Sequence, residues 1–74
     1  MVNKREYFPI GTVLIKCPDI GFYTITSNPI EDVIFAGGLR YDVEFTMWDG
    51  YKQMYNMSLI HLHKDVQQGF YSVL

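Results

Sequence analysis

The sequence predicts an all-β domain of about five to six antiparallel strands. Glycine, proline, asparagine and aspartate recur at intervals of about 8–12 residues, a rhythm typical of short strands in a sandwich or barrel. The segments between these turn residues are dense in β-branched and aromatic residues, which favour strands. Residues 41–48 alternate between two sets of side chains with a period of two, as a strand requires.

The 74-residue chain makes one domain, close to the lower size limit for folding without a disulfide or a metal. Its only cysteine, Cys17, cannot form an intramolecular disulfide. Two histidines and one cysteine do not make a structural zinc site, so no metal or other cofactor is expected. Hydrophobic residues make up 49% of the chain. This content indicates either a dense core or burial of apolar surface against a second copy or a partner.

The first third of the chain predicts a polar arm and two strands. Residues 1–7 form the arm. Residues 12–17 and 22–26 are each rich in β-branched or aromatic side chains and are expected to be strands. Between them, residues 18–21 begin with proline and end with glycine, the order of a β-turn.

The stretch from residue 30 to residue 39 fits two structures. As a helix, it would open at Pro29 and stop at Gly37. As a hairpin, residues 33–36 and 39–41 would flank a two-glycine turn that can adopt positive φ twice. We expect the hairpin, because three consecutive bulky residues suit a strand better than a helix.

The strongest local pattern is a hairpin over residues 41–57. In residues 41–48, Tyr, Val, Phe and Met alternate with Asp, Glu, Thr and Trp. Asp49-Gly50 follows at once, a dipeptide that favours a two-residue turn. Residues 51–57 then form the return strand.

Beyond this hairpin, we expect a short turn and a last strand. Adjacent apolar residues interrupt the alternation at residues 58–60, and a 3₁₀ turn there would direct Ile60 and Leu62 into the core. Residues 69–74 have strand composition and follow a turn at residues 67–69.

The order of these elements resembles a known family. A Tyr-x-Val-x-Phe strand at residues 41–45 leads through Asp49-Gly50 to a return strand, and Leu59-Ile60 precedes a closing strand. In this order the chain is similar to SH3-like barrels, most of all to their Tudor and KOW-type branch. The resemblance covers residues 8–63 and implies a small barrel with a 3₁₀ turn before the closing strand. Residues 64–74 would then be an extension that adds a strand. Small proteins of this kind are often products of phages or mobile elements, and we expect such an origin.

Trp48 leads the candidate binding residues. The alternation places it on the polar face opposite Tyr41, beside a tight turn. A large apolar side chain on a polar face is unusual and indicates a contact surface. Tryptophan and tyrosine dominate the energetics of protein interfaces. Alternatively, Trp48 covers an open end of the barrel. The candidate binding residues are Trp48, Tyr51, Tyr55, Tyr23, Glu44 and Met54.

Four of these aromatic rings could instead form a cage. The barrels that the chain resembles use such cages for methylated amines, which are held by cation–π attraction. Trp48, Tyr51, Tyr55 and Tyr23 would be the walls, and Glu44 the acidic neighbour. In the plainer interpretation, the tyrosines are ordinary core or rim residues.

His61, His63 and Cys17 do not combine into a catalytic set. On a strand, His61 and His63 would share one solvent-exposed face, but a catalytic metal needs a third ligand. A nucleophilic cysteine needs a neighbouring base, which nothing near Cys17 in the sequence supplies, so a buried inert thiol is expected. We therefore expect that the protein is not an enzyme.

Charge and hydropathy argue against nucleic acid and against a membrane as the partner. A net charge of −2 with scattered basic residues argues against a nucleic-acid site that depends on neutralising phosphates. No stretch approaches the ~18 apolar residues of a membrane span, and no export signal is recognisable, so a cytoplasmic protein that does not enter membranes is expected.

The leading hypothesis is a non-catalytic protein-binding module or small inhibitor that acts through the exposed aromatic surface of the hairpin, with another protein as its partner. Two alternatives stay open. One is a nucleic-acid-binding barrel that stacks bases on its aromatic residues. The other is a homo-oligomer that binds or sequesters a small molecule.

Overall fold

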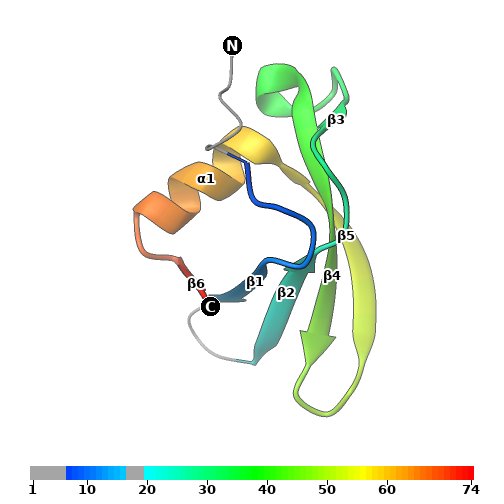
Figure 1. Cartoon of the computed structure of the whole chain (residues 1–74), viewed down its shortest axis with the longest axis vertical. Helices are drawn as coiled ribbons and strands as arrows, with labels where there is room; N and C mark the ends of the chain where they lie inside the picture. Colours follow the sequence, from blue (N-terminus) through cyan, green and yellow to red (C-terminus); the bar gives the residue numbers. More distant parts are fainter. Residues whose placement is uncertain (1–6, 17–19) are drawn as a thin grey trace.

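The computed structural model describes residues 7–16 and 20–74, which form a mostly antiparallel β structure with one helix (Figure 1). The predicted predominance of antiparallel strands is confirmed. Cys17, at the end of the first expected strand, lies outside the described residues. The elements are β1 (Val13–Lys16), β2 (Gly21–Ile25), β3 (Ile30–Glu31), the 3₁₀ turn η2 (Ala36–Gly38), β4 (Leu39–Met47), β5 (Lys52–Ser58), α1 (Leu59–Gln67) and β6 (Tyr71–Val73).

The long strand β4 organises the sheet. One edge of β4 pairs with β5 along almost its whole length. The other edge pairs with β3 at its start and with β2 in its second half. β1 joins β2, and β6 joins β1, so β3, β5 and β6 each have an edge with no partner strand in the described sheet. β5 and β6 do not pair with each other among the described residues, so the sheet curves around the core without closing into a barrel (Figure 1).

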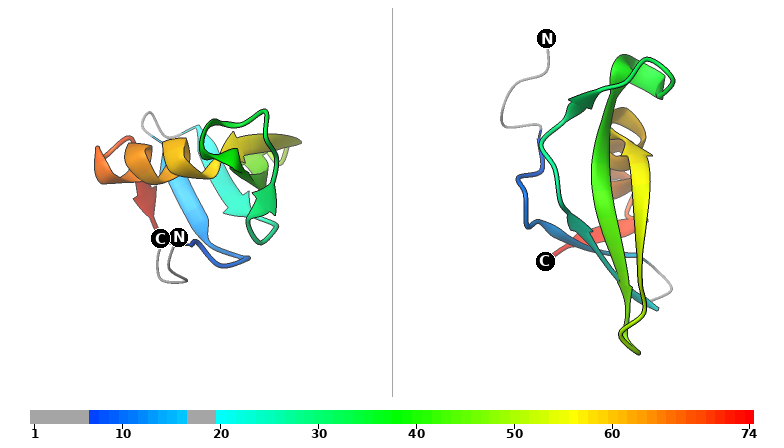
Figure 2. Two further views of the ribbon diagram at one scale, coloured as in Figure 1. Left: turned by 90° about the horizontal axis from the view of Figure 1, so that it is seen from above. Right: turned by 90° about the vertical axis from the view of Figure 1, so that its right-hand side faces the viewer.

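The segment after β5 is an α-helix, and the 3₁₀ turn expected at residues 58–60 is wrong. Ser58 caps α1, because its hydroxyl accepts a hydrogen bond from the His61 backbone N–H at 3.4 Å. Leu59 and Leu62 lie three apart on the buried face of the helix. Ile60 was expected to point inward but is instead exposed. Helix α1 lies across the open side of the curved sheet (Figure 2).

Residues 30–39 form a hairpin with a longer loop than expected. Ile30 and Glu31 pair with Arg40 and Leu39, so the segment is a hairpin, but its first strand lies at residues 30–31. The strand expected at residues 33–36 is wrong, because the chain there turns back in a compact loop that ends in η2.

Asp32 explains why this loop forms. Its side chain accepts a hydrogen bond from the Ile34 backbone N–H and an ion-paired bond from the Arg40 guanidinium at 3.0 Å. Its backbone N–H donates to Gly38 across the loop. Gly37 and Gly38 both have positive φ, which L side chains rarely adopt, so the chain can turn sharply into β4.

The β4–β5 hairpin occupies the predicted residues, but its turn is one residue longer. Gly50 N–H donates to Met47 C=O, and Met47 N–H donates to Tyr51 C=O. Gly50 alone of the turn residues has positive φ, at 95°. A two-residue type I′ turn needs positive φ twice, whereas a three-residue turn with a glycine bulge needs it once. Residues 48–50 are therefore the loop.

The core lies between the curved sheet and α1. We call the face of the sheet that packs toward α1 the inner face and the opposite one the outer face. Tyr41 and Val43 of β4 are fully buried on the inner face, as the alternation predicts. The core cluster consists of Leu14, Ile25, Tyr41, Val43, Leu59, Leu62 and Tyr71. Within the described residues, no helix is long and apolar enough to span a lipid bilayer.

Candidate interaction surface

The β4–β5 hairpin is the longest feature of the molecule and carries exposed apolar side chains. Figure 2 shows its turn extending beyond the other strands. Trp48, Tyr51 and Met54 are each 57% exposed. Exposed apolar side chains are ordinary when scattered singly, but a cluster on one element indicates a contact surface.

Trp48 stands at the turn on the outer face. Its ring lies 5.4 Å from the ring of Phe22, tilted by 46°. Phe22 pairs with Thr46, whose side chain lies on the outer face, so the contact with Phe22 places the Trp48 ring on that face as well. Phe22 on β2 thus supports Trp48, and 57% of the tryptophan is exposed.

Glu44 and Met54 are direct cross-strand neighbours on the same outer face. The Glu44 carboxylate lies 3.9 Å from the ammonium of Lys52, on the next outward position of β5. An exposed ion pair of this length contributes little to stability. On this face the Thr46–Lys52 row lies between Trp48 at the turn and the Glu44–Met54 row, so apolar and charged side chains alternate along the hairpin.

Tyr23 and Tyr55 lie on the other side of the sheet. Tyr23 contacts Phe45 at 4.6 Å and Tyr71 at 5.5 Å between ring centroids, and Phe45 lies 6.4 Å from Tyr55. Burial, and to a smaller extent Tyr55, raises the pKa of the Tyr23 hydroxyl. Tyr23 belongs to the half-buried border of the core, and Tyr55 continues it toward solvent.

The six predicted binding residues therefore divide between two faces. Trp48, Glu44 and Met54 share the outer face, while Tyr23 and Tyr55 line the inner one. Tyr51 lies next to the turn and is exposed. The structure does not bring the four aromatic rings together around a single point, because the sheet separates Trp48 from Tyr23 and Tyr55.

The outer edge of β5 could not be predicted from single residues of the sequence. In an antiparallel pair, the backbone groups of alternate residues point to the partner strand and those of the residues between them point away. The Met47 N–H donates to the Tyr51 carbonyl, so the backbone N–H and C=O groups of Gln53, Tyr55 and Met57 point to β4. The N–H and C=O groups of Lys52, Met54 and Asn56 consequently face away from β4. Only the strand order shows this, and the sequence could not indicate which strand would lie outermost.

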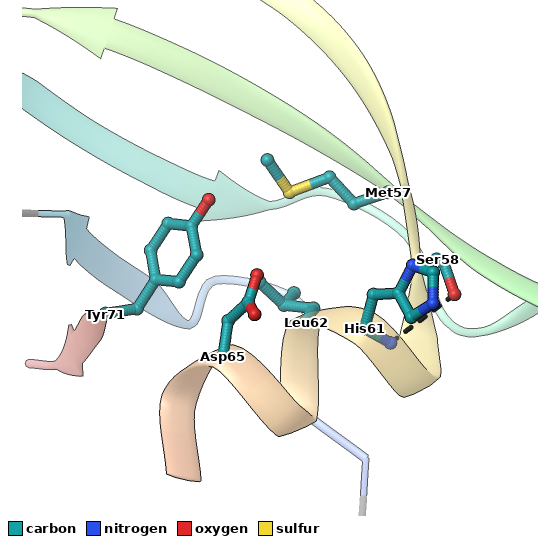
Figure 3. Close-up of a pocket in the computed structure, with 6 residues that line it drawn as sticks. All are labelled: Met57, Ser58, His61, Leu62, Asp65 and Tyr71. Carbon is teal, nitrogen blue, oxygen red and sulfur yellow. Dashed lines mark hydrogen bonds between the residues drawn. The ribbon is translucent and has the colours of Figure 1, made fainter. Parts of the chain in front are cut away.

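A pocket of about 150 Å³ opens between α1, the end of β5, and β6 (Figure 3). Figure 3 shows Tyr71 and Asp65 at one end of it and Ser58 and His61 at the other. A cavity of this volume can hold a molecule the size of benzene. Burial, followed by Tyr23 and Asp65, raises the pKa of Tyr71 to about 12, so its hydroxyl stays neutral. The lining residues are Met57, Ser58, His61, Leu62, Asp65 and Tyr71.

Ser58 at this pocket has a structural role. Its hydroxyl donates to the Ala36 carbonyl at 3.0 Å and accepts from the His61 backbone N–H, so it holds the start of α1 in place.

The two histidines lie on different sides of α1, and the expectation of a shared, solvent-exposed strand face is wrong. His61 is exposed. The His63 ring stacks on Phe8 at 4.3 Å, and its Nε2 lies 2.9 Å from the Tyr41 hydroxyl. That hydroxyl also accepts a hydrogen bond from the Phe8 backbone N–H, which ties the segment before β1 to the core. Burial raises the pKa of the Tyr41 hydroxyl. Among the described residues, no group of three or more His, Cys, Asp or Glu side chains could hold a metal ion.

A second set of exposed apolar side chains was not among the predicted binding residues. Val33 and Ile34, expected in a strand, are 94% and 83% exposed in the loop before η2. They lie at the opposite end of β4 from Trp48. Their exposure follows from the Asp32 turn, which the sequence pattern did not reveal.

Comparisons of the chain with protein families, with curated proteins and with solved structures find no significant match.

Proposed function

We propose that this protein is a non-catalytic binding module, or a small inhibitor, that acts on another protein through the β4–β5 hairpin. The observation that carries the proposal is the exposure of Trp48, Tyr51 and Met54, each 57%, on one hairpin that extends past the core. The resemblance of residues 8–63 to SH3-like barrels belongs to the same proposal.

The geometry of Trp48 supports this function. Phe22 contacts one part of the indole, which limits the ring's motion before any partner arrives. A pre-positioned aromatic side chain loses less conformational freedom on binding than a free one, so more of its contact energy contributes to affinity. Tryptophan is also the residue type most enriched among interface hot spots.

The surface beside Trp48 would add specificity. Met54 is unbranched and adapts to the shape of a partner. Glu44 and Lys52 next to it are the rim charges, which influence the rate of association more than its strength.

Trp48→Ala is the test of this function. Tagged wild-type protein is used to capture partners from lysate of the producing cell, with and without nuclease, and the affinity for a captured protein is then measured by calorimetry. We expect Trp48→Ala to weaken the affinity about 30-fold, the loss of roughly 2 kcal/mol typical of a hot spot. Ile34→Ala is the matched control, because it also truncates a highly exposed apolar side chain, at the far end of β4.

Two results would contradict the proposal. One is equal binding by folded Trp48→Ala and wild-type protein, with circular dichroism confirming the fold. The other is loss of all captured partners on nuclease treatment, which would favour the nucleic-acid alternative.

A further inference from the structure

The pocket between α1, the end of β5 and β6 lies where the sheet does not close (Figure 3). β5 and β6 do not pair with each other among the described residues, and α1 packs against both of them. The inner-face side chains at this gap are therefore not covered by a neighbouring strand. An apolar hollow that receives a few polar groups from different elements is the usual form of a small-molecule site.

The Tyr71 hydroxyl is a buried polar group of this pocket that has no partner in the fold. The residue is only 7% exposed, and within the part of the chain that the structure describes its hydroxyl makes no hydrogen bond. Every fully enclosed side-chain oxygen or nitrogen of the described residues has a hydrogen-bond partner, so the Tyr71 oxygen must reach the open space of the pocket. Buried tyrosine hydroxyls normally have a partner. This one therefore offers a hydrogen bond to a ligand.

Asp65 adds an uncompensated negative charge at the same end of the pocket (Figure 3). Among the described residues, no Lys, Arg or His side chain forms an ion pair with its carboxylate. The charge acts on the Tyr71 hydroxyl, because Asp65 is one of the causes that raise the pKa of that group. Asp65 also lies in the last turn of α1, where the helix dipole disfavours a carboxylate. A cation in the pocket would compensate both effects.

The walls beside these two polar groups are apolar. Leu62 is 2% exposed and is held in the core, whereas Met57 is half-buried and unbranched, so it adapts to the shape of a ligand. The volume of about 150 Å³ accepts a hydrocarbon body the size of benzene. At the far end, the Ser58 hydroxyl is already occupied by two hydrogen bonds.

We propose that this pocket binds a small primary amine in its protonated form, with a compact hydrocarbon body of about six carbon atoms. The ammonium donates hydrogen bonds to the Asp65 carboxylate and to the Tyr71 hydroxyl oxygen, and the body lies against Met57 and Leu62. Hydrogen bonds between charged groups are shorter and stronger than those between neutral groups. None of these four residues is among the exposed side chains on which the hairpin function rests, so each proposal can fail without the other.

Other classes of ligand fit the pocket less well. An anion would be repelled by the Asp65 carboxylate, and a neutral hydrocarbon would leave both the carboxylate and the Tyr71 hydroxyl without a partner. A metal ion is disfavoured because, in the described part of the chain, no group of three or more His, Cys, Asp or Glu side chains could hold one. The Lys16 ammonium lies 6.0 Å from the centroid of the Tyr71 ring, but Lys16 neither lines the pocket nor forms an ion pair with Asp65.

Titration with benzylamine, which is protonated at neutral pH, tests the proposal. In ¹H–¹⁵N NMR spectra, the backbone amides of residues 61–65 and 71–72 should shift on addition of the amine. We expect a dissociation constant on the order of 1 mM, which suits so small a ligand. Benzyl alcohol has nearly the same shape without the charge and should bind at least about tenfold more weakly.

Asp65→Asn tests the carboxylate directly. It should weaken benzylamine binding by about tenfold or more and leave benzyl alcohol binding unchanged. The variant should fold, because it removes an acid from the last turn of a helix. Asp49→Asn is the matched control: it removes the same charge at the other end of β5, keeps the oxygen that accepts from the Tyr51 backbone N–H, and should bind benzylamine like wild type. Tyr71→Phe should weaken benzylamine binding by about threefold to tenfold.

Three results would overturn the proposal. The first is the absence of amide shifts in residues 61–65 and 71–72. The second is equal affinity of the wild-type protein for benzylamine and benzyl alcohol. The third is an equal loss of benzylamine binding in Asp65→Asn and Asp49→Asn, which would indicate attraction to the net charge of the chain.

Discussion

The ionisation of Tyr71 makes the free energy of unfolding depend on pH. Its pKa is raised to about 12 by burial first and by Tyr23 and Asp65 next, whereas a tyrosine in the unfolded chain ionises near 10. The stabilisation is thus complete below about pH 10 and is lost as the pH rises toward about 12. We expect the free energy of unfolding, measured in urea, to fall across this window. The free energy of unfolding of Tyr71→Phe should fall less steeply over the same pH range. An identical pH profile for both proteins would contradict this account.

The period of two in β4 predicts Tyr41 in the core, and the structure confirms it. Trp48 was expected in the same strand but lies in the turn after it, where its contact with Phe22 puts the ring on the outer face. The contact of Trp48 with Phe22 was not predictable, because it depends on β2 pairing with β4 rather than on either sequence segment. The same holds for Tyr71, whose neighbours come from β2 and α1.

At the scale of elements, Ser58 joins β5 to α1 and fixes where the helix begins. We expect Ser58→Ala to lower the free energy of unfolding by about 1–2 kcal/mol, because both the helix cap and the bond to the Ala36 carbonyl are lost. Ser72→Ala, on the exposed surface of β6, is the control and should change it by less than about 0.5 kcal/mol. Equal urea midpoints for the two variants would contradict the assigned role of Ser58.

The elements that the sequence predicted correctly are those with strong local signals. The hairpin over residues 41–57 follows from alternation and from Asp49-Gly50, and only its turn length differed. Helix α1 was not predicted. After Leu59 and Ile60, histidine and leucine alternate over residues 61–63, and this alternation also suits the end of a strand. A helical signal was present in Leu59, Leu62 and Val66, spaced at i, i+3 and i+7, behind a serine cap.

Whether the sheet closes is a property of the whole molecule. Helix α1 takes the place expected for a closing strand, and β6 joins β1 instead. Closure depends on which distant segments pair, and local composition does not encode that. The free β5 edge, and with it part of the candidate interaction surface, therefore became visible only in the folded chain.

The pairing of β1 with β6 has a mechanical consequence. Leu14 pairs with Val73, and Lys16 with Tyr71, so the chain enters β1 and leaves β6 at the same end of this ladder. A force that pulls Leu74 away from the start of β1 would first load the bond from the Leu74 N–H to the Val13 carbonyl, then the Leu14–Val73 pair, and would break the bonds of this ladder one after another. Strands pulled past each other must instead break all their bonds together. The fold is therefore built to yield to tension at low force, beginning at β6, while the β4–β5 hairpin still holds its surface in place.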